Sequence, residues 1–518
     1  MRSTAALPHG ARDRHAHRLP ARPGAPEAVG EPPAVAVVGG GIAGLAAATA
    51  LAERGVRVTV FEREPALGGR LAGWTTTLQD GSKVTMSRGF HAFFRQYYNL
   101  RALLRRSDPR LERLTALADY PLRHANGLQD SFRHVPRTPP WSALGFALTS
   151  PTFRPADLPR MNVGAALALM DVRVPDVYER LDTTSAHDFL GAIRFPEAAH
   201  HLAFEVFSRS FFADPRRLSA AEMVLMFHIY FLGSAEGLLF DVPDDPFPAA
   251  LWDPLGGYLE RLGVDVRVAE PVDRVARTSR GGFRVSAGQR ERTYDACVLA
   301  LDTSGLQALA RQSPDLADAT WRERVARLRT APPFLVSRLW LDRAVAPDRP
   351  GFLGTSGFAG LDNVSVLDRW EREASHWARR TGGSVVELHA YAVEEGADRS
   401  AVERRFVEQL HAVYPETRDA RIVDARHEWR DDCPLFAVGG YADRPAVRTS
   451  DPHLMVAGDL VRTGLPVALM ERAATSGLLA ANALLDRWRL QGHTLWTVPL
   501  RGRSALLRSL AGRSARRT

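Results

Sequence analysis

The sequence predicts an α/β fold in which one discontinuous domain is interleaved with a second, α+β domain. Two observations lead to this class. A buried strand, a glycine turn, a small-residue helix and a second strand follow one another from Val35 to Glu62, and a related strand, turn and helix recur from Pro452 to Leu485. Two long insertions separate these units, so the domain that contains both must be built from distant parts of the chain.

The first unit reads VAVVGGGIAGLAAATALAERGVRVTVFE and predicts a Rossmann-type dinucleotide site. Gly39 permits the tight turn, Gly41 lets backbone N–H groups approach a pyrophosphate at the helix N-terminus, and Gly44 lets the helix lie close to the strand. Glu62 ends the second strand, where a carboxylate can accept hydrogen bonds from ribose hydroxyls. This unit alone does not decide whether the dinucleotide is FAD or NAD.

The second unit indicates another contact with the same cofactor. It consists of a short apolar strand, an Ala457-Gly458-Asp459 turn and a helix that begins near Met470. A long cofactor such as FAD needs its diphosphate and ribityl chain held from both sides, and an Asp after a strand can accept from ribityl hydroxyls. A plain strand and helix closing the sheet would explain the periodicity but not the paired glycine and acid. The pair therefore favours FAD.

Composition indicates a globular protein of a reducing cytoplasm. The chain has 518 residues, of which 45% are hydrophobic and 24% charged, enough for a large core and more than one domain. Cys297 and Cys433 lie far apart and outside any metal-binding spacing, so we expect neither a disulfide nor a metal site. The adjacent His200 and His201 would diverge on a helix and make a poor metal pair.

The positive charge of the chain is concentrated at its C-terminal end. Residues 487–518 contain no acid and eight arginines, namely Arg487, Arg489, Arg501, Arg503, Arg508, Arg513, Arg516 and Arg517. Their formal charge of +8 equals the net charge of the whole chain, so residues 1–486 have a net charge of zero. We therefore expect no nucleic-acid partner. With Trp488 and Trp496 interleaved, this tail can lie on an anionic membrane surface, each arginine contributing about 1 kcal/mol, or remain disordered in solution.

The two units and the insertions define the expected domains. Residues 1–33, rich in Arg, Ala and Pro, are expected to form a disordered tail. The FAD-binding domain would comprise 34–110, 240–311 and 431–486, the substrate domain 111–239 and 312–430, and the basic tail 487–518. The apolar run Ala34 to Ala52 carries the turn glycines, so we expect no membrane-spanning helix.

The first insertion is predicted to be largely helical and the second to contain a sheet. Ser219 to Glu222 matches a capping box, and Met223 to Leu232 then runs apolar on all sides. Such a helix either packs in the core or lines a slot for a long hydrocarbon. The runs FLVSRLWL and SVVELHAYA of the second insertion read as strands.

Two further motifs follow the first unit. In Leu67-Gly68-Gly69-Arg70, Gly69 would let the backbone approach the cofactor and Arg70 can neutralise its pyrophosphate. The run GFHAFFRQYYN begins at Gly89. Together, GxGxxG, Glu62, LGGR, GFHAFFRQYYN, and AGD followed by ALMERAATSG resemble the FAD-dependent carotenoid desaturases of the wider amine oxidase and desaturase superfamily.

This resemblance covers about Ala34 to Leu485 and implies an amine oxidase/phytoene desaturase-like fold. The stretch SRGFHAFFRQYYNLRALLRR, with PRTPP and SPTFR further on, is similar to the carotene desaturase/methylases that aromatise β-carotene rings. The family's FAD contacts would fall on Ala43, Glu62, Arg63, Arg70, His91, Ala92, Tyr97, Asp459 and Met470, beside the motif glycines Gly39, Gly41, Gly44, Gly69 and Gly458. Neither cysteine lies in the AGD block, so FAD is expected to be bound non-covalently.

Two residues near the expected flavin are open to interpretation. Plant-type phytoene desaturases carry an acid and a small residue before the glycine of this run, whereas this chain has Ser87 and Arg88. Arg88 is thereby a candidate near the substrate end. His91 can act as a general base, although a contact with backbone or flavin suits it better.

The resemblance implies an oxidoreductase in which the flavin itself is the oxidant, because a hydrocarbon offers acid and base residues little to act on. Hydride would leave an allylic carbon of a β-ring, a methyl group would migrate, and proton loss with a second oxidation would give an aromatic carotenoid of the isorenieratene type. The expected partners are a carotenoid, a membrane surface, and quinone or oxygen as electron acceptor. The expected location is the cytoplasmic face of the cell membrane.

Three alternatives share this fold. An acyclic carotenoid desaturase or isomerase of the phytoene or ζ-carotene type would use the same flavin site. Amine oxidation fits less well, because those enzymes commonly place a lysine near the flavin and Lys83, the sole lysine, follows a predicted turn. A non-catalytic prenyl- or lipid-binding protein of the dissociation-inhibitor type would not need the complete set of flavin motifs.

Overall fold

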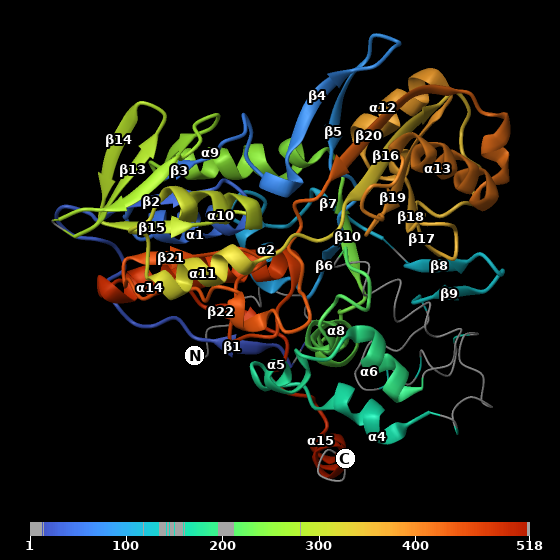
Figure 1. Cartoon of the computed structure of the whole chain (residues 1–518). Coiled ribbons are helices and arrows are strands. Elements are labelled where there is room, and N and C mark those ends of the chain that lie inside the picture. The colour runs from blue at the N-terminus through green and yellow to red at the C-terminus, as the bar shows by residue number, and fades with distance from the viewer. Residues whose placement is uncertain are drawn as a thin grey trace, which may run out of the picture.

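The computed structural model describes residues 13, 15–117, 119–133, 161–194, 212–279 and 281–514, with the isolated positions 141, 145, 150 and 159. Two large sheets organise this part of the chain, one parallel with five strands and one mixed with seven (Figure 1). The predicted α/β class with an interleaved α+β part is confirmed. The PRTPP motif, most of SPTFR, and His200 and His201 lie outside the described residues.

The parallel sheet has the order β11-β3-β2-β15-β21. Its strands are β2 (Ala34–Val38), β3 (Arg57–Phe61), β11 (Asp265–Arg267), β15 (Ala296–Leu299) and β21 (Leu454–Val456). The central strand β2 reads AVAVV and is almost wholly buried, as expected for a parallel strand covered on both faces. The first and second glycine units thus join one sheet, as the sequence predicted.

Helices α1 (Ile42–Ala52) and α14 (Leu469–Arg487) pack against each other beside this sheet. Small residues permit the close approach, since a Cβ placed on Gly477 would lie 2.2 Å from the carbonyl oxygen of Ala43. An antiparallel sheet of β12 (Arg274–Arg277), β13 (Phe283–Ala287) and β14 (Arg290–Tyr294) also contacts the parallel sheet. There, Tyr294 meets Phe61 edge-on, with 6.2 Å between ring centroids.

The mixed sheet has the order β20-β16-β19-β18-β17-β8-β9. Its strands are β8 (Pro121–His124), β9 (Gln129–Ser131), β16 (Phe334–Leu341), β17 (Phe352–Ser356), β18 (Asn363–Val366), β19 (Ser384–Ala390) and β20 (Ile422–Arg430). The strands predicted from FLVSRLWL and SVVELHAYA are β16 and β19. Strand alternation sends Leu339 toward helix α13 (Arg399–Val413) and Trp340 toward helix α12 (Arg372–Thr381), so the two helices cover opposite faces.

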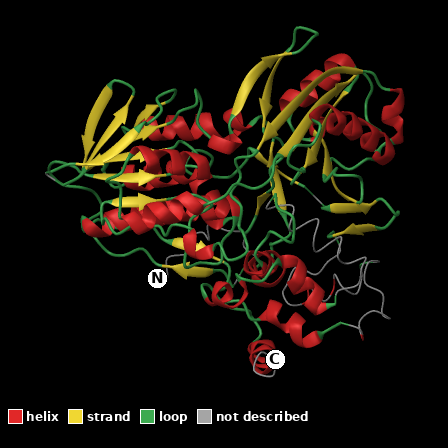
Figure 2. Ribbon diagram, viewed as in Figure 1, coloured by secondary structure: helices red, strands yellow, loops and turns green. Residues whose placement is uncertain are grey.

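The first insertion begins with the strands β7 (Leu114–Ala116), β8 and β9, which were not predicted, and its described part from residue 161 on is mainly helical, as predicted (Figure 2). Its helices are α4 (Val163–Ala166), α5 (Asp176–Leu181), α6 (Ala186–Ile193) and α8 (Ala220–Phe227), and α8 continues as a π-helical segment, His228–Gly233. Ser219 caps α8 by accepting from the N–H of Ala221 at 3.2 Å. The capping-box prediction is wrong for Glu222, whose carboxylate turns into the core and binds two arginines.

Further short strands and helices belong to neither large sheet. These are β4 (Gly73–Thr77), β5 (Lys83–Ser87), β6 (Phe93–Phe94), β7 (Leu114–Ala116), β10 (Phe240–Pro243), α2 (Tyr98–Leu104), α9 (Asp253–Arg261), α10 (Thr303–Gln312) and α11 (Ala319–Arg327). The hairpin β4–β5 differs from its expected place in the nucleotide-binding part. Its Val84 and Met86 pack with Trp340 and Trp377 of the mixed sheet and α12.

The N-terminal tail that was expected to be disordered and the basic C-terminal tail both contain regular structure. Strand β1 (His17–Leu19) pairs with β22 (Leu495–Thr497) in an antiparallel ladder, and Asp13 forms an ion pair with Arg503 at 3.2 Å. Leu490 and Leu495 are buried in the main core, so the tail does not begin at Arg487. The C-terminal helix is α15 (Ala505–Ser514).

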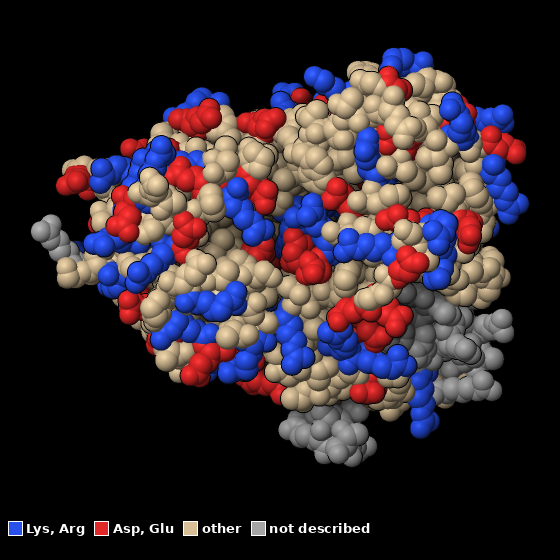
Figure 3. Space-filling model, turned by 45° about the horizontal axis from the view of Figure 1, so that its top comes forward, with Lys and Arg blue, Asp and Glu red and all other residues tan. Residues whose placement is uncertain are grey.

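Acidic and basic side chains are interspersed on the face shown in Figure 3. This mixture agrees with the balance of charges upstream of residue 487. In the described segments, no helix is both long enough and apolar enough to cross a lipid bilayer.

Candidate cofactor and substrate site

One cavity of about 500 Å³ extends from the glycine turns of the parallel sheet to the inner end of the mixed sheet. The predicted cofactor residues are brought together there. Its wall includes Gly39, Gly41, Ala43, Glu62, Arg63, Gly69, Arg70, His91, Ala92, Tyr97, Gly458, Asp459 and Met470, together with Arg88. Of the predicted residues, only Gly44 does not line it.

The first glycine turn has the backbone geometry that its sequence predicted. Gly39 has φ +112°, and a Cβ there would lie 2.2 Å from the carbonyl oxygen of Ala300. A Cβ on Gly44 would lie 1.9 Å from the carbonyl oxygen of Gly39, so Gly44 serves helix packing rather than the cavity wall. Gly41 is the N-cap of α1 and provides no side-chain cap. The first N–H groups of α1 are therefore available for an anion.

Glu62 is buried and holds this turn in place. Its Oε2 accepts from the N–H of Gly40 at 2.7 Å, and its Oε1 accepts from the N–H of Glu64 at 2.9 Å. Because these donors fix the carboxylate at the cavity wall, it is oriented before any ligand arrives. The sequence predicted Glu62 at the cofactor but not this second role.

The second glycine turn meets the LGGR motif through an ion pair. Arg70 Nη2 donates to Asp459 Oδ2 at 2.5 Å. Burial alone would lower the pKa of Arg70, but the carboxylate of Asp459 raises it, so the guanidinium stays charged. The neighbouring Gly458 has φ +147° and donates its N–H to Ser476 Oγ at 2.8 Å. The hydrogen bond to Ser476 connects the second glycine turn to α14, and the ion pair with Asp459 connects the LGGR turn to it in turn.

The remaining predicted cations are also paired. Arg63 is half exposed and binds Asp302 at 3.2 Å. Arg88, the candidate at the substrate end, forms an ion pair with Asp432. Because its charge is neutralised at the cavity wall, Arg88 contributes a polar boundary rather than an isolated positive charge.

Three predicted residues of the GFHAFFRQYYN run face the cavity. His91 Nδ1 donates to the carbonyl oxygen of Gly89 at 2.9 Å, which leaves Nε2 as the unprotonated nitrogen of the assigned tautomer. Burial lowers the pKa of His91 to about 4, so its ring is neutral at neutral pH. The hydroxyl of Tyr97 lies 2.7 Å from that of Tyr230.

Aromatic rings line the part of the cavity beyond His91. Phe90 stacks on Phe352 with 4.4 Å between ring centroids, and Tyr120 meets Phe240 edge-on at 5.5 Å. Phe94 and Tyr97 extend this wall. We call these six residues the aromatic chamber. Residues 223–232 do not contribute to the cavity wall but pack in the core. Of the two roles expected for this apolar helix, core packing is therefore the one observed, and lining of a hydrocarbon slot is not.

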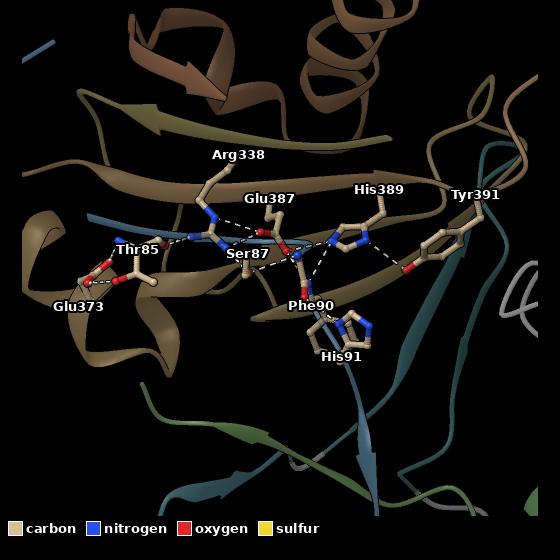
Figure 4. A network of polar contacts seen from close by, with 10 residues as sticks. Thr85, Ser87, Phe90, His91, Arg338, Glu373, Glu387, His389 and Tyr391 are labelled. Carbon is tan, nitrogen blue, oxygen red and sulfur yellow. Dashed lines mark hydrogen bonds and ion pairs between the residues drawn. The ribbon is translucent and has the colours of Figure 1, made fainter. Parts of the chain in front are cut away.

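A buried polar row on β16 and β19 was not predicted from the sequence (Figure 4). Arg338 donates to Glu387 at 2.8 Å, and Glu387 accepts from His389 Nε2 at 2.9 Å. The hydroxyl of Tyr391 lies 3.2 Å from His389 Nδ1. Burial alone would raise the pKa of Glu387, but Arg338 and His389 lower it to about 2. The signal was the spacing of Glu387, His389 and Tyr391, which places all three on one face of a strand.

The cavity residues fit FAD. The open N-terminus of α1 suits a diphosphate, and the oriented carboxylates of Glu62 and Asp459 suit sugar hydroxyls. The backbones of Gly41 and Gly69 approach so closely that a Cβ on Gly69 would lie 3.1 Å from the Gly41 Cα, in the space where a cofactor would pass. Among the described residues, no group of three or more His, Cys, Asp or Glu side chains is arranged to hold a metal ion.

Comparison with known proteins identifies a flavin-containing family. A family model described as flavin-containing amine oxidoreductase matches residues 42–485. The chain is 70% identical to a carotenoid phi-ring synthase of Streptomyces griseus, over 97% of each chain. It is 28% identical to a carotenoid phi-ring synthase of Chlorobaculum tepidum over 91% of each, and 24% identical to a 15-cis-phytoene desaturase of Synechococcus elongatus over 88% of this chain and 96% of that one.

Solved structures show the same fold at low sequence identity. Putrescine oxidase bound to putrescine superposes with a TM-score of 0.65 at 17% identity, over 88% of this chain and 100% of that one. Cyclohexylamine oxidase from Brevibacterium oxydans gives 0.63 at 16% identity, with the same coverage. The chain therefore belongs to the flavin-containing amine oxidoreductase family and, within it, to the FAD-dependent carotenoid desaturases.

Proposed function

We propose that this oxidoreductase converts the β-ring of β-carotene into a trimethylphenyl ring, giving an aromatic carotenoid of the isorenieratene type. The identity of 70% to a carotenoid phi-ring synthase supports the ring as the reacting part. The single structural observation that supports it most is the aromatic chamber. It shares one cavity with the FAD cradle, the two glycine turns with Glu62, Arg70 and Asp459. A carotenoid has no ionisable group, so aromatic walls rather than an ion pair would orient it.

Each ring conversion removes two hydrides and two protons and moves one methyl group to the neighbouring carbon. FAD, when bound, supplies the two-electron oxidations. The rings of the aromatic chamber exclude water and place π-electron density around any positive charge that develops on the substrate. Because the methyl group moves within the ring, the chain needs no binding site for a methyl donor.

FAD would be held non-covalently by both glycine turns. The N-terminus of α1 and Arg70 would face its diphosphate, Glu62 its ribose and Asp459 its ribityl chain. Cys433 also lines the cavity, but burial raises the pKa of this thiol to about 11, so it stays protonated and is a poor nucleophile. Release of all flavin on acid precipitation is the expected result, and flavin retained on the denatured chain would contradict it.

We also propose that the C-terminal end attaches the protein to the inner face of the cell membrane. Leu506 and Leu510 of α15 are 69% and 40% exposed, in a segment of the chain that carries arginines and no acid. Quinone or oxygen would reoxidise the flavin. Sedimentation with anionic vesicles, but not with neutral ones, is expected of the full chain and should be lost on removal of residues 503–518.

An acyclic carotenoid is the second candidate substrate, favoured by the similarity to 15-cis-phytoene desaturase over 88% of this chain. It would occupy the same chamber without presenting a ring. A lipid-binding protein without catalysis is less consistent with a cavity in which both glycine turns and their carboxylates are complete.

Pigment analysis separates these candidates. The chain is produced in cells that accumulate β-carotene and, separately, in cells that accumulate phytoene or lycopene. New carotenoids with trimethylphenyl rings, formed from β-carotene alone, are the expected result. Unchanged β-carotene together with desaturated acyclic pigments would overturn the proposal in favour of the second candidate. Purified protein that binds no FAD would favour the lipid-binding role.

A further inference from the structure

We propose that Tyr391, His389 and Glu387 form a proton-accepting relay, in which Tyr391 takes the proton that a carotenoid ring loses and His389 receives the phenol proton in turn. This role rests on the proposed ring aromatisation, which releases one proton with each two-electron oxidation. Some group on the cavity wall must accept these protons, because the aromatic chamber excludes water.

The hydrogen bonds give the relay a direction. Asn363 Nδ2 donates to the hydroxyl of Tyr391 at 2.9 Å, so this hydroxyl directs its own proton to His389 Nδ1 at 3.2 Å. The other ring nitrogen, Nε2, lies 2.9 Å from Glu387 Oε1. The backbone N–H of Phe90 also points toward Nε2, at 3.3 Å, but it lies closer to Glu387 Oε1, at 2.6 Å. Because the ionised Glu387 can only accept, the contact at 2.9 Å assigns the proton of the neutral imidazole to Nε2. His389 Nδ1 is thus an acceptor that faces Tyr391.

Glu387 is fixed in a position that orients the imidazole of His389. Its Oε1 also accepts from the N–H of Phe90 at 2.6 Å, and its Oε2 accepts from Arg338 Nε and Nη2 at 3.0 and 2.8 Å. Glu387 and His389 are 0% and 1% exposed. Glu387 is therefore a positioning residue, which holds the tautomer and orientation of His389 in the same way as an acid behind a catalytic histidine.

The position of the polar row relative to the cavity favours a role in proton transfer over a purely structural role. Arg338 anchors its outer end by donating to the carbonyl oxygen of Thr85 at 2.7 Å, away from the cavity. His389, Tyr391 and Asn363 all line the cavity at the other end. An ion pair that only stabilised the sheet would not need a histidine and a phenol extending from it to the cavity wall.

The step balances in protons and electrons. In the cation that hydride loss leaves, a ring C–H bond breaks and its electron pair stays in the ring as a new double bond. The proton forms an O–H bond with Tyr391, whose original O–H bond breaks as its proton forms an N–H bond with His389 Nδ1. The resulting imidazolium is paired with the carboxylate of Glu387. Its proton returns through Tyr391 to the cavity, where reduction of the quinone or oxygen acceptor, which takes up a hydride equivalent together with one proton, consumes it before the next oxidation.

Tyr391→Phe tests the relay with the least change in packing. Tyr414→Phe is the matched control, because it removes another phenol from the same domain that lies in a separate core cluster, outside the cavity wall. We expect Tyr391→Phe to slow formation of aromatic rings from β-carotene about 100-fold, with FAD content unchanged and the melting temperature lowered by only a few degrees, about the loss of two buried hydrogen bonds. Tyr414→Phe should keep the wild-type rate. A fall of less than about tenfold in Tyr391→Phe, or a fall explained by lost FAD, would overturn the relay.

A second measurement does not depend on turnover. In protein with 15N-labelled histidine, the resonances that disappear in His389→Gln identify His389. We expect Nε2 to carry the proton and Nδ1 to show the shift of a hydrogen-bond acceptor, which Tyr391→Phe should abolish. A proton on Nδ1 would overturn the relay. If wild-type protein forms no aromatic rings, the proposed function fails, and the nitrogen shifts alone then decide whether the relay exists.

Discussion

Arg70 and Asp459 meet in an ion pair of 2.5 Å although 389 positions separate them in the chain. Arg70 follows the second strand of the parallel sheet, and Asp459 follows its last strand, β21. Since the carboxyl ends of parallel strands lie at one edge of a sheet, the two side chains come together wherever this sheet forms. The pair therefore joins both halves of the FAD cradle before the cofactor binds.

Asp459→Asn should weaken FAD binding more than it weakens the fold. The amide can still accept one hydrogen bond, but it removes the nearest counter-charge of the partly buried Arg70 guanidinium and disturbs its orientation. Hydrogen bonds to charged groups contribute about 1.5–3 kcal/mol, so the Kd for FAD should rise roughly 10- to 100-fold in a flavin fluorescence titration. Asp443→Asn, which breaks the more exposed pair with Arg327 at 2.7 Å, is the control and should leave the Kd unchanged. Equal effects of both variants would contradict this role of the pair.

Gly477→Ala should separate α1 from α14. The added Cβ would overlap the carbonyl oxygen of Ala43 at 2.2 Å, and neither backbone can move without shifting the glycine turn at the start of α1. Overpacking of this kind costs about 1–3 kcal/mol, which should lower both the melting temperature and the FAD content. At Gly464, a Cβ would meet nothing within 4 Å, so Gly464→Ala should behave as wild type in thermal unfolding. An unchanged Gly477→Ala protein would mean that the helices can separate without cost.

The sequence was most informative where one residue type is demanded by backbone geometry. Gly39 and Gly44 could be predicted because a Cβ at either position would overlap a backbone oxygen. Asp459 and Arg70 could be predicted to lie near the cofactor, but their direct contact could not, because it depends on the order of strands in the sheet. Sequence alone therefore identified the residues near the cofactor, but not the ion pair that joins the two glycine turns.

The parts that were missed depend on tertiary packing. His389 lies in strand β19 and Tyr391 directly follows its end, both next to apolar residues in the chain, and only the arrangement of the mixed sheet shows which face meets the cavity. Strand β1 has three residues, too few for any periodicity, and it forms because β22 offers a partner. The sequence around Glu222 matches a capping box, in which its carboxylate would accept from the backbone N–H of Ser219. In the folded chain the carboxylate binds two arginines from distant segments instead.

Glu222→Gln should be among the more destabilising single substitutions in the core. Glu222 of α8 accepts from Arg472 at 2.8 Å, from Tyr178 at 2.8 Å, and from Arg444. Burial alone would raise the pKa of Glu222, but Arg472 and Arg444 lower it to about 2. Removing its charge leaves two buried guanidinium groups unpaired, which costs about 3–5 kcal/mol in urea unfolding.

Glu416→Gln provides the matched comparison for Glu222→Gln. It breaks an ion pair with Arg349 whose two side chains are 30% and 26% exposed, so water can replace the lost contact. Its cost should stay near 0–1 kcal/mol, roughly the range of surface pairs. Similar losses in the two variants would show that burial does not govern the strength of these pairs.

His228 should make the protein less stable in mild acid. Its Nε2 donates to the carbonyl oxygen of Pro499 at 2.6 Å, while its buried Nδ1 has no hydrogen-bond partner among the described residues. Burial and, more weakly, the charge of Arg503 lower the pKa of His228 from 6.5 to about 4. Between these pH values the unfolded chain binds a proton that the folded protein does not, so stability is full above about pH 6.5 and falls as the pH approaches 4.

His228→Gln isolates this contribution, because the amide can donate to Pro499 but cannot take up a proton. At pH 7.5 its free energy of unfolding should lie within about 1 kcal/mol of wild type. At pH 4 the variant should have gained about 3 kcal/mol relative to wild type, the equivalent of the shift in pKa. Urea unfolding at several pH values measures both quantities, with His376→Gln on the exposed side of α12 as a control that should follow the wild-type curve. Parallel curves for wild type and His228→Gln would show that His228 takes up its proton equally in the folded and unfolded protein. The acid sensitivity would then come from other buried groups, such as His91 and His493, whose pKa values burial also lowers to about 4.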